Sequence, residues 1–540
     1  MEKADVGYWT YFFLLTTNSL LLISAMSVTE QFFGKVFRVS LGICAGMFLL
    51  AVVSLSHGSG IILTAIGITL LVITFHHPQF ALRIIFLELF LNPHGHLLSV
   101  EIGPINLSLR MVVFLGFFLG YGAHHLTRRT WPALRWSQLK IFLPLCLAIM
   151  LGFMTGVLSQ NPLSVFQDGN AYFFLLYAIP ILSLRWDSAQ RHAMFQVFAA
   201  GVVWTTLSSL GILYFFTHFS GESIRGVYTF LRDVRLAEIT HINGALYRVF
   251  MQTQFFVIAF GGFILALLLR ASLRRDRLIL SLLLGLVLTL ALLSFSRSFW
   301  LAMVCSGLVF LLGLCFLYGR RFPWKPLFFW SAFSGVLAMA SLLLVIFFPI
   351  PSVRIGGEDL VHAFKKRTSE SQDVALSSRW NLFPPMWSTV LAHPITGNGF
   401  GKAVTFTSDD PRVRVLSPDG TWSTTAMEWG WLELWLKMGI LGPIGFLSLF
   451  YFLVREFFSY QKTDQSWIGL GFITALVFLY VTHFFSPYLN HPIGIGFILF
   501  AFLFLPEKRK ESVQAVGHIP LKMPLLTKPI SPLAESRRSR

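Results

Sequence analysis

The chain has 540 residues, of which 55% are hydrophobic, 16% are aromatic and only 12% are charged. With a mean hydropathy of +0.69, this composition excludes an ordinary soluble domain and indicates an integral membrane protein. The net charge of +17 is also typical of nucleic-acid-binding proteins, but no basic and aromatic patch follows a known nucleic-acid-binding module. We therefore expect membrane lipids as partners and no nucleic acid.

Apolar runs of bilayer-spanning length recur along almost the whole chain. Each must be helical, because a lipid-exposed backbone has no other partner for its polar groups. At roughly 20 residues per span, we expect an all-α polytopic transmembrane helix bundle of about 14 spans. The first run, residues 8–26, is interpreted as retained and not as a cleaved signal. Only His-His-Pro separates the runs at 58–75 and 79–93, so one of them is a candidate re-entrant segment, which leaves the side of the N-terminus open.

Basic residues gather in short loops between the apolar runs, and the positive-inside rule places such loops in the cytoplasm. These loops lie within residues 124–140, 185–192, 270–277, 319–326 and 455–464, and the tail after Pro506 is basic as well. The apolar runs alternate accordingly from residue 108 to the end. Three segments then face outside: 218–248, the turn around Arg297, and the polar stretch 350–428. The last is too long for a simple connector and is predicted to fold as a cap carrying short helices.

Cysteine and histidine spacing gives no sign of a metal centre. The four cysteines all lie inside apolar runs and are interpreted as core residues: Cys44, Cys146, Cys305 and Cys315. His483 and His491 flank the last predicted outer turn without acidic partners nearby, so a metal site there is the weaker interpretation. We expect no metal and no cofactor.

The stretch LLSFSRSFWLAM, residues 292–303, places Arg297 at the outer end of one predicted span and the start of the next. A topology signal would not place a cation there. Two interpretations stay open. The guanidinium either snorkels to interfacial water or holds an anion, for which phosphate suits the planar arginine fork.

Downstream, SSRWNLFPPMWSTVLAHPITGNGFGKAV (377–404) combines an arginine, a helix-like aromatic stretch and a turn with glycines at 397, 399 and 401. The proline and the glycines end the helix and allow a tight turn, and alone such a cluster is a weak phosphate-loop signal. The next stretch, EWGWLELWLKMGILGPIGFLSLF, is interpreted as one span that Glu428 opens.

These elements, taken in order, resemble the O-antigen ligase and polymerase family. The resemblance rests on an SxSRS-type element, an Arg-Trp helix leading to HPxxGxGFG, and a polar residue opening a span that continues to GxxG, within residues 240–450. It implies a glycosyltransferase of bacterial surface-polysaccharide assembly in the inner membrane. Such an enzyme takes a polyprenyl-diphosphate-linked glycan as donor and acts at the outer leaflet, facing the periplasm, without a metal or a nucleotide sugar.

The resemblance also implies site residues. The family's span arginine falls on Arg297, its loop arginine falls on Arg379, and a third, in ALYRVFMQTQFF, falls on Arg248. Arginines near the interface would bind the diphosphate and stabilise the negative charge that grows on it as it leaves. Ligases of the family usually carry a histidine where this chain has Glu428. A carboxylate can also take the proton of the acceptor hydroxyl, and the change favours the more variable polymerases. The alternative is that Glu428 caps a helix start.

The predicted organisation has four parts. N-terminal transmembrane helices occupy residues 1–240, and an O-antigen ligase-like core with the extracytoplasmic loop 350–428 occupies 241–455. C-terminal transmembrane helices follow at 456–505, before a basic cytoplasmic tail at 506–540.

Other residues on the outer side carry open alternatives. His393, in the helix-ending turn, is interpreted as structural. Arg225, Arg232 and Arg235 recur at spacings of seven and three, which places them on one helical face that is either solvated or turned to sugars and headgroups. The tryptophans around the predicted site either stack on sugars or lie at the bilayer interface, and the sequence favours neither role. They are Trp380, Trp387, Trp422, Trp429, Trp431 and Trp435.

The first functional hypothesis is a polymerase that joins lipid-diphosphate-linked repeat units of an O-antigen or exopolysaccharide. A ligase that passes the finished glycan to a lipid A-core or another acceptor is the close alternative. A transporter or flippase for the same lipid-linked glycan would show charged residues at mid-membrane and internal repeats. A scaffold without chemistry would leave Arg297, Arg379 and Glu428 dispensable. Polysaccharide-assembly proteins are further candidate partners.

Overall fold

The computed structural model describes residues 32–54, 58–130, 136–219, 221–243, 246–319, 322–348, 374–409, 411–462 and 465–505, together with Pro132 and Leu134. These residues belong to one compact unit that ends at Leu505. The predicted first span, residues 350–373 of the predicted cap and the basic tail lie outside the described residues.

Eight helices in the described part of the chain are long and apolar enough to cross a membrane: α3 (Lys35–Ser54), α4 (Ser59–His76), α6 (Leu109–Thr127), α11 (Ser188–His218), α14 (Arg274–Leu293), α15 (Arg297–Tyr318), α16 (Trp324–Phe347) and α21 (Leu441–Phe458). Four further apolar helices are shorter: α8 (Leu143–Ser159), α13 (Gln254–Arg270), α22 (Ser466–Thr482) and α23 (Pro492–Phe502). The protein is thus a mostly helical, multi-pass membrane protein, as predicted, while the expected number of about 14 spans stays a prediction.

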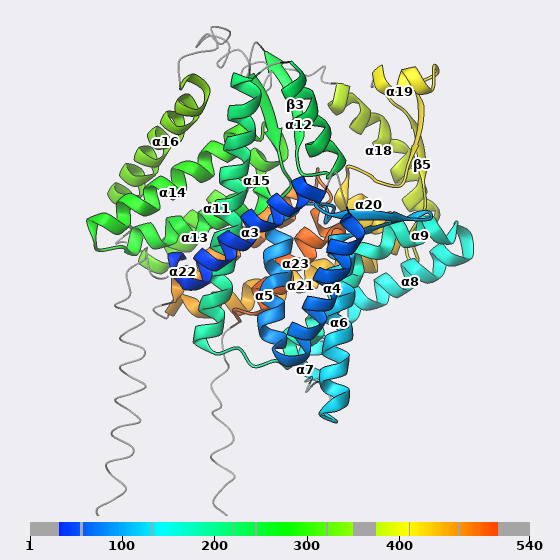
Figure 1. Cartoon of the computed structure of the whole chain (residues 1–540), viewed down its shortest axis with the longest axis horizontal. Helices are drawn as coiled ribbons and strands as arrows, with labels where there is room; N and C mark the ends of the chain where they lie inside the picture. Colours follow the sequence, from blue (N-terminus) through cyan, green and yellow to red (C-terminus); the bar gives the residue numbers. More distant parts are fainter. Residues whose placement is uncertain are drawn as a thin grey trace, which may run out of the picture. The chain divides into compact units, whose positions relative to one another are not determined.

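The remaining helices have 3 to 19 residues. They are α5 (Pro78–Leu91), α7 (Trp136–Leu139), α9 (Pro162–Gly169), η1 (Asn170–Tyr177), α10 (Ala178–Ser183), α12 (Glu222–Asp233), α18 (Val374–Ala392), α19 (Pro411–Leu416), α20 (Gly430–Met438), η3 (Ser459–Lys462) and η4 (Tyr488–Asn490). Figure 1 shows α12, α18 and α19 at one end of the helix bundle and α7 at the other. We call the first of these the α12 end.

Small residues and aromatic rings hold the helices together. Helix α6 packs on α4 through Gly116 and Gly120, where an added Cβ would meet backbone oxygens of α4. Such close approach replaces the hydrophobic driving force that helices lack in lipid. The centre of the bundle is aromatic, with Phe198 of α11, Phe256 of α13 and Phe500 of α23 among its buried rings. Helices α13, α22 and α23 are largely buried, whereas only 17–22% of the apolar segments of α3, α4, α15 and α16 is buried.

Three two-stranded antiparallel hairpins interrupt the helical pattern, which the all-α prediction did not anticipate. They are β1 (Ser99–Ile102) with β2 (Ile105–Ser108), β3 (Glu238–Asn243) with β4 (Leu246–Phe250), and β5 (Val404–Thr407) with β6 (Thr421–Thr424). In the register of the second hairpin Thr240 lies opposite Arg248. The described part of segment 350–428 therefore contains a hairpin besides the helices α18 and α19.

The stretch after Glu428, interpreted as one span, is two helices. Helix α20 ends at Met438, and α21 begins at Leu441. Gly439, between them, has a φ of +65°, a backbone conformation that favours glycine. A Cβ there would lie 1.9 Å from the carbonyl oxygen of Ile395. The close passage of the segment after α18 therefore requires the break.

Candidate functional site

Arg297 is the first residue of α15, at the turn that joins α14 to α15. The turn is compact: Phe295 is buried with a φ of +45°, and the indole of Trp300 donates to the Ala291 carbonyl over 2.8 Å. Arg297 itself is partly buried. The turn therefore presents one cation from a fixed backbone at the α12 end.

Arg248 lies at the same turn. Its Nε donates to the carbonyl oxygen of Ser294 over 2.7 Å, and its guanidinium lies 4.9 Å from the ring centre of Phe250. The Phe250 ring in turn lies 5.7 Å from that of Phe299 in the first turn of α15. Arg248 and Ser294 are 46 residues apart in the chain, and Ser294 belongs to the turn that carries Arg297. The fold thus brings two of the three predicted arginines to the same turn.

Arg379 lies in α18 and forms an ion pair with Glu428. The side chains of Arg379 and Glu428 are 32% and 50% exposed, so the pair is open to solvent. The backbone carbonyl of Arg379 accepts a hydrogen bond from the Trp429 indole over 2.9 Å. Glu428 precedes α20, whose N-cap is Trp429 and which has no side-chain cap. The structure thus contradicts the alternative in which Glu428 caps a helix, since its carboxylate pairs with Arg379 instead.

The turn between α22 and α23 connects these two groups of residues. Ser486 in this turn lies within hydrogen-bonding distance of Ser298, with 3.2 Å between the hydroxyl oxygens. Its neighbour Phe485 contacts Trp429 with 5.6 Å between ring centres. Arg297, Arg248, Arg379 and Glu428 are therefore carried by elements that meet at the α12 end.

The glycine turn after α18 does not have the free amides of a phosphate loop. All five consecutive amides donate within the protein: Gly397 to His393, Asn398 to Leu436, Gly399 to Lys437, Phe400 to Gly152, and Gly401 to the Asp168 carboxylate. The glycines serve close packing instead, because a Cβ on Gly399 would lie 2.2 Å from the backbone nitrogen of Gly156. The weak phosphate-loop signal in the sequence was therefore wrong.

A buried charged cluster lies next to this turn, and the sequence analysis missed it. Lys437 is 2% exposed and contacts Asp168 and Glu433, each over 2.5 Å. Its ammonium also donates to the carbonyl of Thr425 over 2.9 Å, three residues before Glu428. Glu433 and Lys437 lie four residues apart inside an apolar run, and this spacing could have indicated a buried ion pair from the sequence. Asp168 could not be found from the sequence, because it comes from α9, far away in the chain.

A second buried pair fixes the segment between α5 and β1. Arg110, at the start of α6, pairs with Glu88 over 3.0 Å and also donates to the carbonyls of Asn92 and Pro93. His94 in this segment lies 6.3 Å from His491, ring centre to ring centre. Burial lowers the pKa of His94 to about 3, assisted by the nearby positive charges, and lowers the pKa of His491 to about 4.

The remaining candidates have ordinary roles. Arg225 and Arg232 are exposed on α12 and pair with Glu222 and Asp233. His483 is fully buried, and its Nδ1 accepts the amide of Leu489 over 3.2 Å. Within the described residues no group of three or more His, Cys, Asp or Glu is placed to hold a metal ion.

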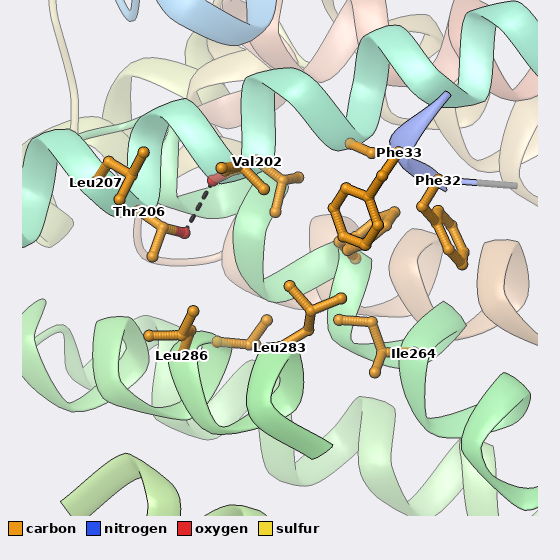
Figure 2. Close-up of a pocket in the computed structure, with 12 residues that line it drawn as sticks. Phe32, Phe33, Val202, Thr206, Leu207, Ile264, Leu283 and Leu286 are labelled. Atoms are coloured by element: carbon orange, nitrogen blue, oxygen red, sulfur yellow. Dashed lines mark hydrogen bonds between the residues drawn. The ribbon is translucent and has the colours of Figure 1, made fainter. Parts of the chain in front are cut away.

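An apolar pocket lies elsewhere, between α11, α13, α14 and the residues that precede α3 (Figure 2). Of its twelve lining residues only Thr206 is polar, and its hydroxyl donates to the Val202 carbonyl over 2.8 Å. Figure 2 shows Phe32, Phe33 and Leu283 facing the same space. The pocket has no titratable lining residue, so acid–base chemistry is not located there.

The fold and the site define a multi-pass membrane protein with arginines and a carboxylate gathered at one end of the bundle. Residues 282–447 match the family model described as O-Antigen ligase. The match supports the family predicted from the sequence, whose members, the ligases and polymerases, are glycosyltransferase-like enzymes. The matched region runs from α14 to α21 and includes Arg297, Arg379 and Glu428. No curated protein and no solved structure matches the chain.

Proposed function

We propose that the protein polymerises polyprenyl-diphosphate-linked oligosaccharide repeat units of a bacterial surface polysaccharide, an O-antigen or an exopolysaccharide, at the outer leaflet of the inner membrane. The observation that carries the proposal is the convergence of Arg297, Arg248 and Arg379, from three separate segments, on one end of the bundle. A cluster of guanidinium groups at a membrane interface suits a lipid-linked diphosphate.

In this mechanism the arginines bind the donor diphosphate. As the bond between the anomeric carbon and the phosphate oxygen breaks, negative charge grows on that oxygen and the guanidinium groups stabilise it. The acceptor hydroxyl forms the new bond to the same carbon, and polyprenyl diphosphate leaves. Arg248, through its bond to Ser294, also fixes the turn that carries Arg297.

Glu428 takes the proton of the acceptor hydroxyl in the same step. In the structure Glu428 is paired with Arg379. A diphosphate that binds Arg379 displaces the carboxylate and frees it for the acceptor. Donor binding thereby prepares the base, which orders the reaction with the donor first.

The ligase remains a second candidate function, because the matched family model is described as a ligase. A glycan or lipid acceptor would then replace the growing chain at the same site. The glutamate at position 428, where ligases of the family usually carry histidine, favours the polymerase.

The test replaces Arg297 by Ala and by Lys in the native host, with protein levels checked by blotting. Arg225→Ala is the matched control, since Arg225 is an exposed, ion-paired arginine of α12. We expect surface glycan to collapse with Ala and to recover in part with Lys, because ammonium keeps the charge but loses the planar fork. Single repeat units left on the acceptor identify a polymerase, and full-length glycan left on the carrier identifies a ligase. Normal glycan in both Arg297 variants contradicts the proposal.

A further inference from the structure

Helix α18 exposes an apolar stripe between Trp380 and Leu391. Trp380, Pro384, Trp387 and Leu391 recur at i, i+4, i+7 and i+11, which places them on one helical face. Trp380, Trp387 and Leu391 are 57%, 40% and 57% exposed, and Ile395, just beyond the helix, is 71% exposed. The opposite face is buried, so the stripe is not the side by which α18 packs on the protein.

The buried face of α18 fixes the orientation of the helix. Leu382, Met386 and Val390 pack in one apolar cluster with Val404 of β5 and Leu436 of α20. These buried residues recur every four positions, which places them on one face of the helix. The exposed stripe is therefore held in a constant direction.

The C-terminal end of the exposed stripe lies at the ends of two apolar helices. The carbonyl of Pro394 accepts the amide of Ile440, next to the start of α21. Gly399 lies against the backbone of Gly156 in α8. Both helices carry exposed apolar residues close to these points: Ile444 and Leu447 of α21, and Met154, Val157 and Leu158 of α8. The stripe thus continues the apolar surface that these helices turn to lipid.

We propose that α18 lies in the membrane interface, with its exposed stripe against lipid. An interfacial helix buries its apolar face at the boundary between headgroups and acyl chains, and tryptophans are enriched at that depth. The stripe carries no charged side chain, because the sequence has no Lys, Arg, Asp or Glu between Arg379 and Lys402. Pro384 lies between the two tryptophans, and Leu391 and Ile395 extend the apolar stripe beyond Trp387.

The position of Trp387 agrees with a lipid contact. Its ring lies perpendicular to that of Trp435, with 6.0 Å between ring centres. The Trp435 indole donates to the Pro394 carbonyl over 2.8 Å, which satisfies its polar group inside the protein. The pair therefore offers apolar ring surface at the edge of the bundle.

The lipid contact has a consequence for Arg379, which directly precedes Trp380. With the stripe in the interface, the guanidinium of Arg379 is held at the depth of the lipid headgroups. This consequence alone rests on the proposed function, because it is useful only if the substrate is a lipid-linked diphosphate. The lipid contact itself does not depend on the reaction.

The test uses spin labels on the full chain in nanodiscs of phosphatidylethanolamine and phosphatidylglycerol. The four native cysteines are replaced, and single cysteines are placed at Leu391 and Ile395. Asn381 and Ser388, which are exposed beside the stripe, provide matched control positions. Collisions with oxygen report lipid, and collisions with a water-soluble nickel chelate report solvent.

We expect labels at 391 and 395 to collide mainly with oxygen, and labels at 381 and 388 to collide mainly with nickel. Equal nickel accessibility at all four positions would place the stripe in water, as for a glycan-binding surface, and would overturn the proposal. Protection from both reagents at 391 and 395 would mean that protein covers the stripe, and would overturn it too. Because the readout is independent of glycosyl transfer, its failure and that of the proposed function can be distinguished.

Discussion

Lys437 is a buried cation that holds two carboxylates and one backbone carbonyl together. Removing one partner of a buried ion pair leaves uncompensated charge in a medium that solvates it poorly. We predict that Lys437→Met destabilises the protein by about 3–5 kcal/mol, seen as a lower unfolding temperature in detergent. Lys140→Met, at an exposed lysine, is the control.

A rescue variant separates charge from packing at this cluster. Combining Lys437→Met with Asp168→Asn and Glu433→Gln removes all three charges, so stability should recover in part. If Lys437→Met unfolds at the same temperature as Lys140→Met, the cluster contributes nothing to the fold.

His94 and His491 predict an acid-sensitive fold. The pKa of each is lowered by burial, to about 3 and about 4, while the ordinary value near 6.5 applies once the chain unfolds. The stability that depends on their neutrality is fully present above pH 6.5 and is lost as the pH falls toward about 4. Each histidine contributes at most roughly 1.4 kcal/mol per pH unit in that window.

The charges that face His94 come from several elements: His491, Arg110, Arg235 and His96. Replacing His94 by Gln should therefore flatten the dependence of unfolding temperature on pH between about pH 7 and pH 5. The exposed His393 replaced by Gln is the control. A slope equal to that of the native protein in His94→Gln would refute the assignment.

At the scale of elements, the glycine turn after α18 is a packing junction. Gly399 has a φ of +84°, and its missing Cβ makes room for the backbone of α8. We predict that Gly399→Ala abolishes the monodisperse peak in size-exclusion chromatography, because neither backbone can move aside. Gly335→Ala in α16, where a Cβ meets open space, should be neutral. Equal yields of the two variants would contradict the packing role.

The sequence was informative about elements that depend on local pattern. The apolar runs predicted the long helices, and the turn between α14 and α15 lies where the polar residues around Arg297 placed it. The break between α20 and α21 was missed, although the GxxG motif that begins at Gly439 was noted, because the contact that requires the break comes from the distant Ile395. The four-residue strands carry too short a pattern to stand out among aromatic and β-branched residues.

The candidate site shows the same division between local and long-range information. Arg297, Arg379 and Glu428 could be chosen from motifs along the chain. The bond from Arg248 to Ser294, the Arg379–Glu428 ion pair and the link from Asp168 to Lys437 could not. Each of these contacts joins segments that only the tertiary fold brings together.

At the scale of the whole molecule, the region that matches the O-Antigen ligase model is not self-contained. Asp168 of α9 and Arg248 of β4 lie outside residues 282–447, yet they contact Lys437 and the turn before α15. Segments outside the matched region therefore contact the site and its surroundings directly. A fragment limited to the matched region would lack both contacts.

The most direct test of the central claim is glycosyl transfer by the purified protein in liposomes, supplied with a polyprenyl-diphosphate-linked oligosaccharide. The account predicts longer lipid-linked glycans with release of polyprenyl diphosphate, loss of both with Arg297→Ala, and native behaviour of Arg225→Ala. Transfer by Arg297→Ala at the native rate, in a protein that is folded and inserted, would contradict it.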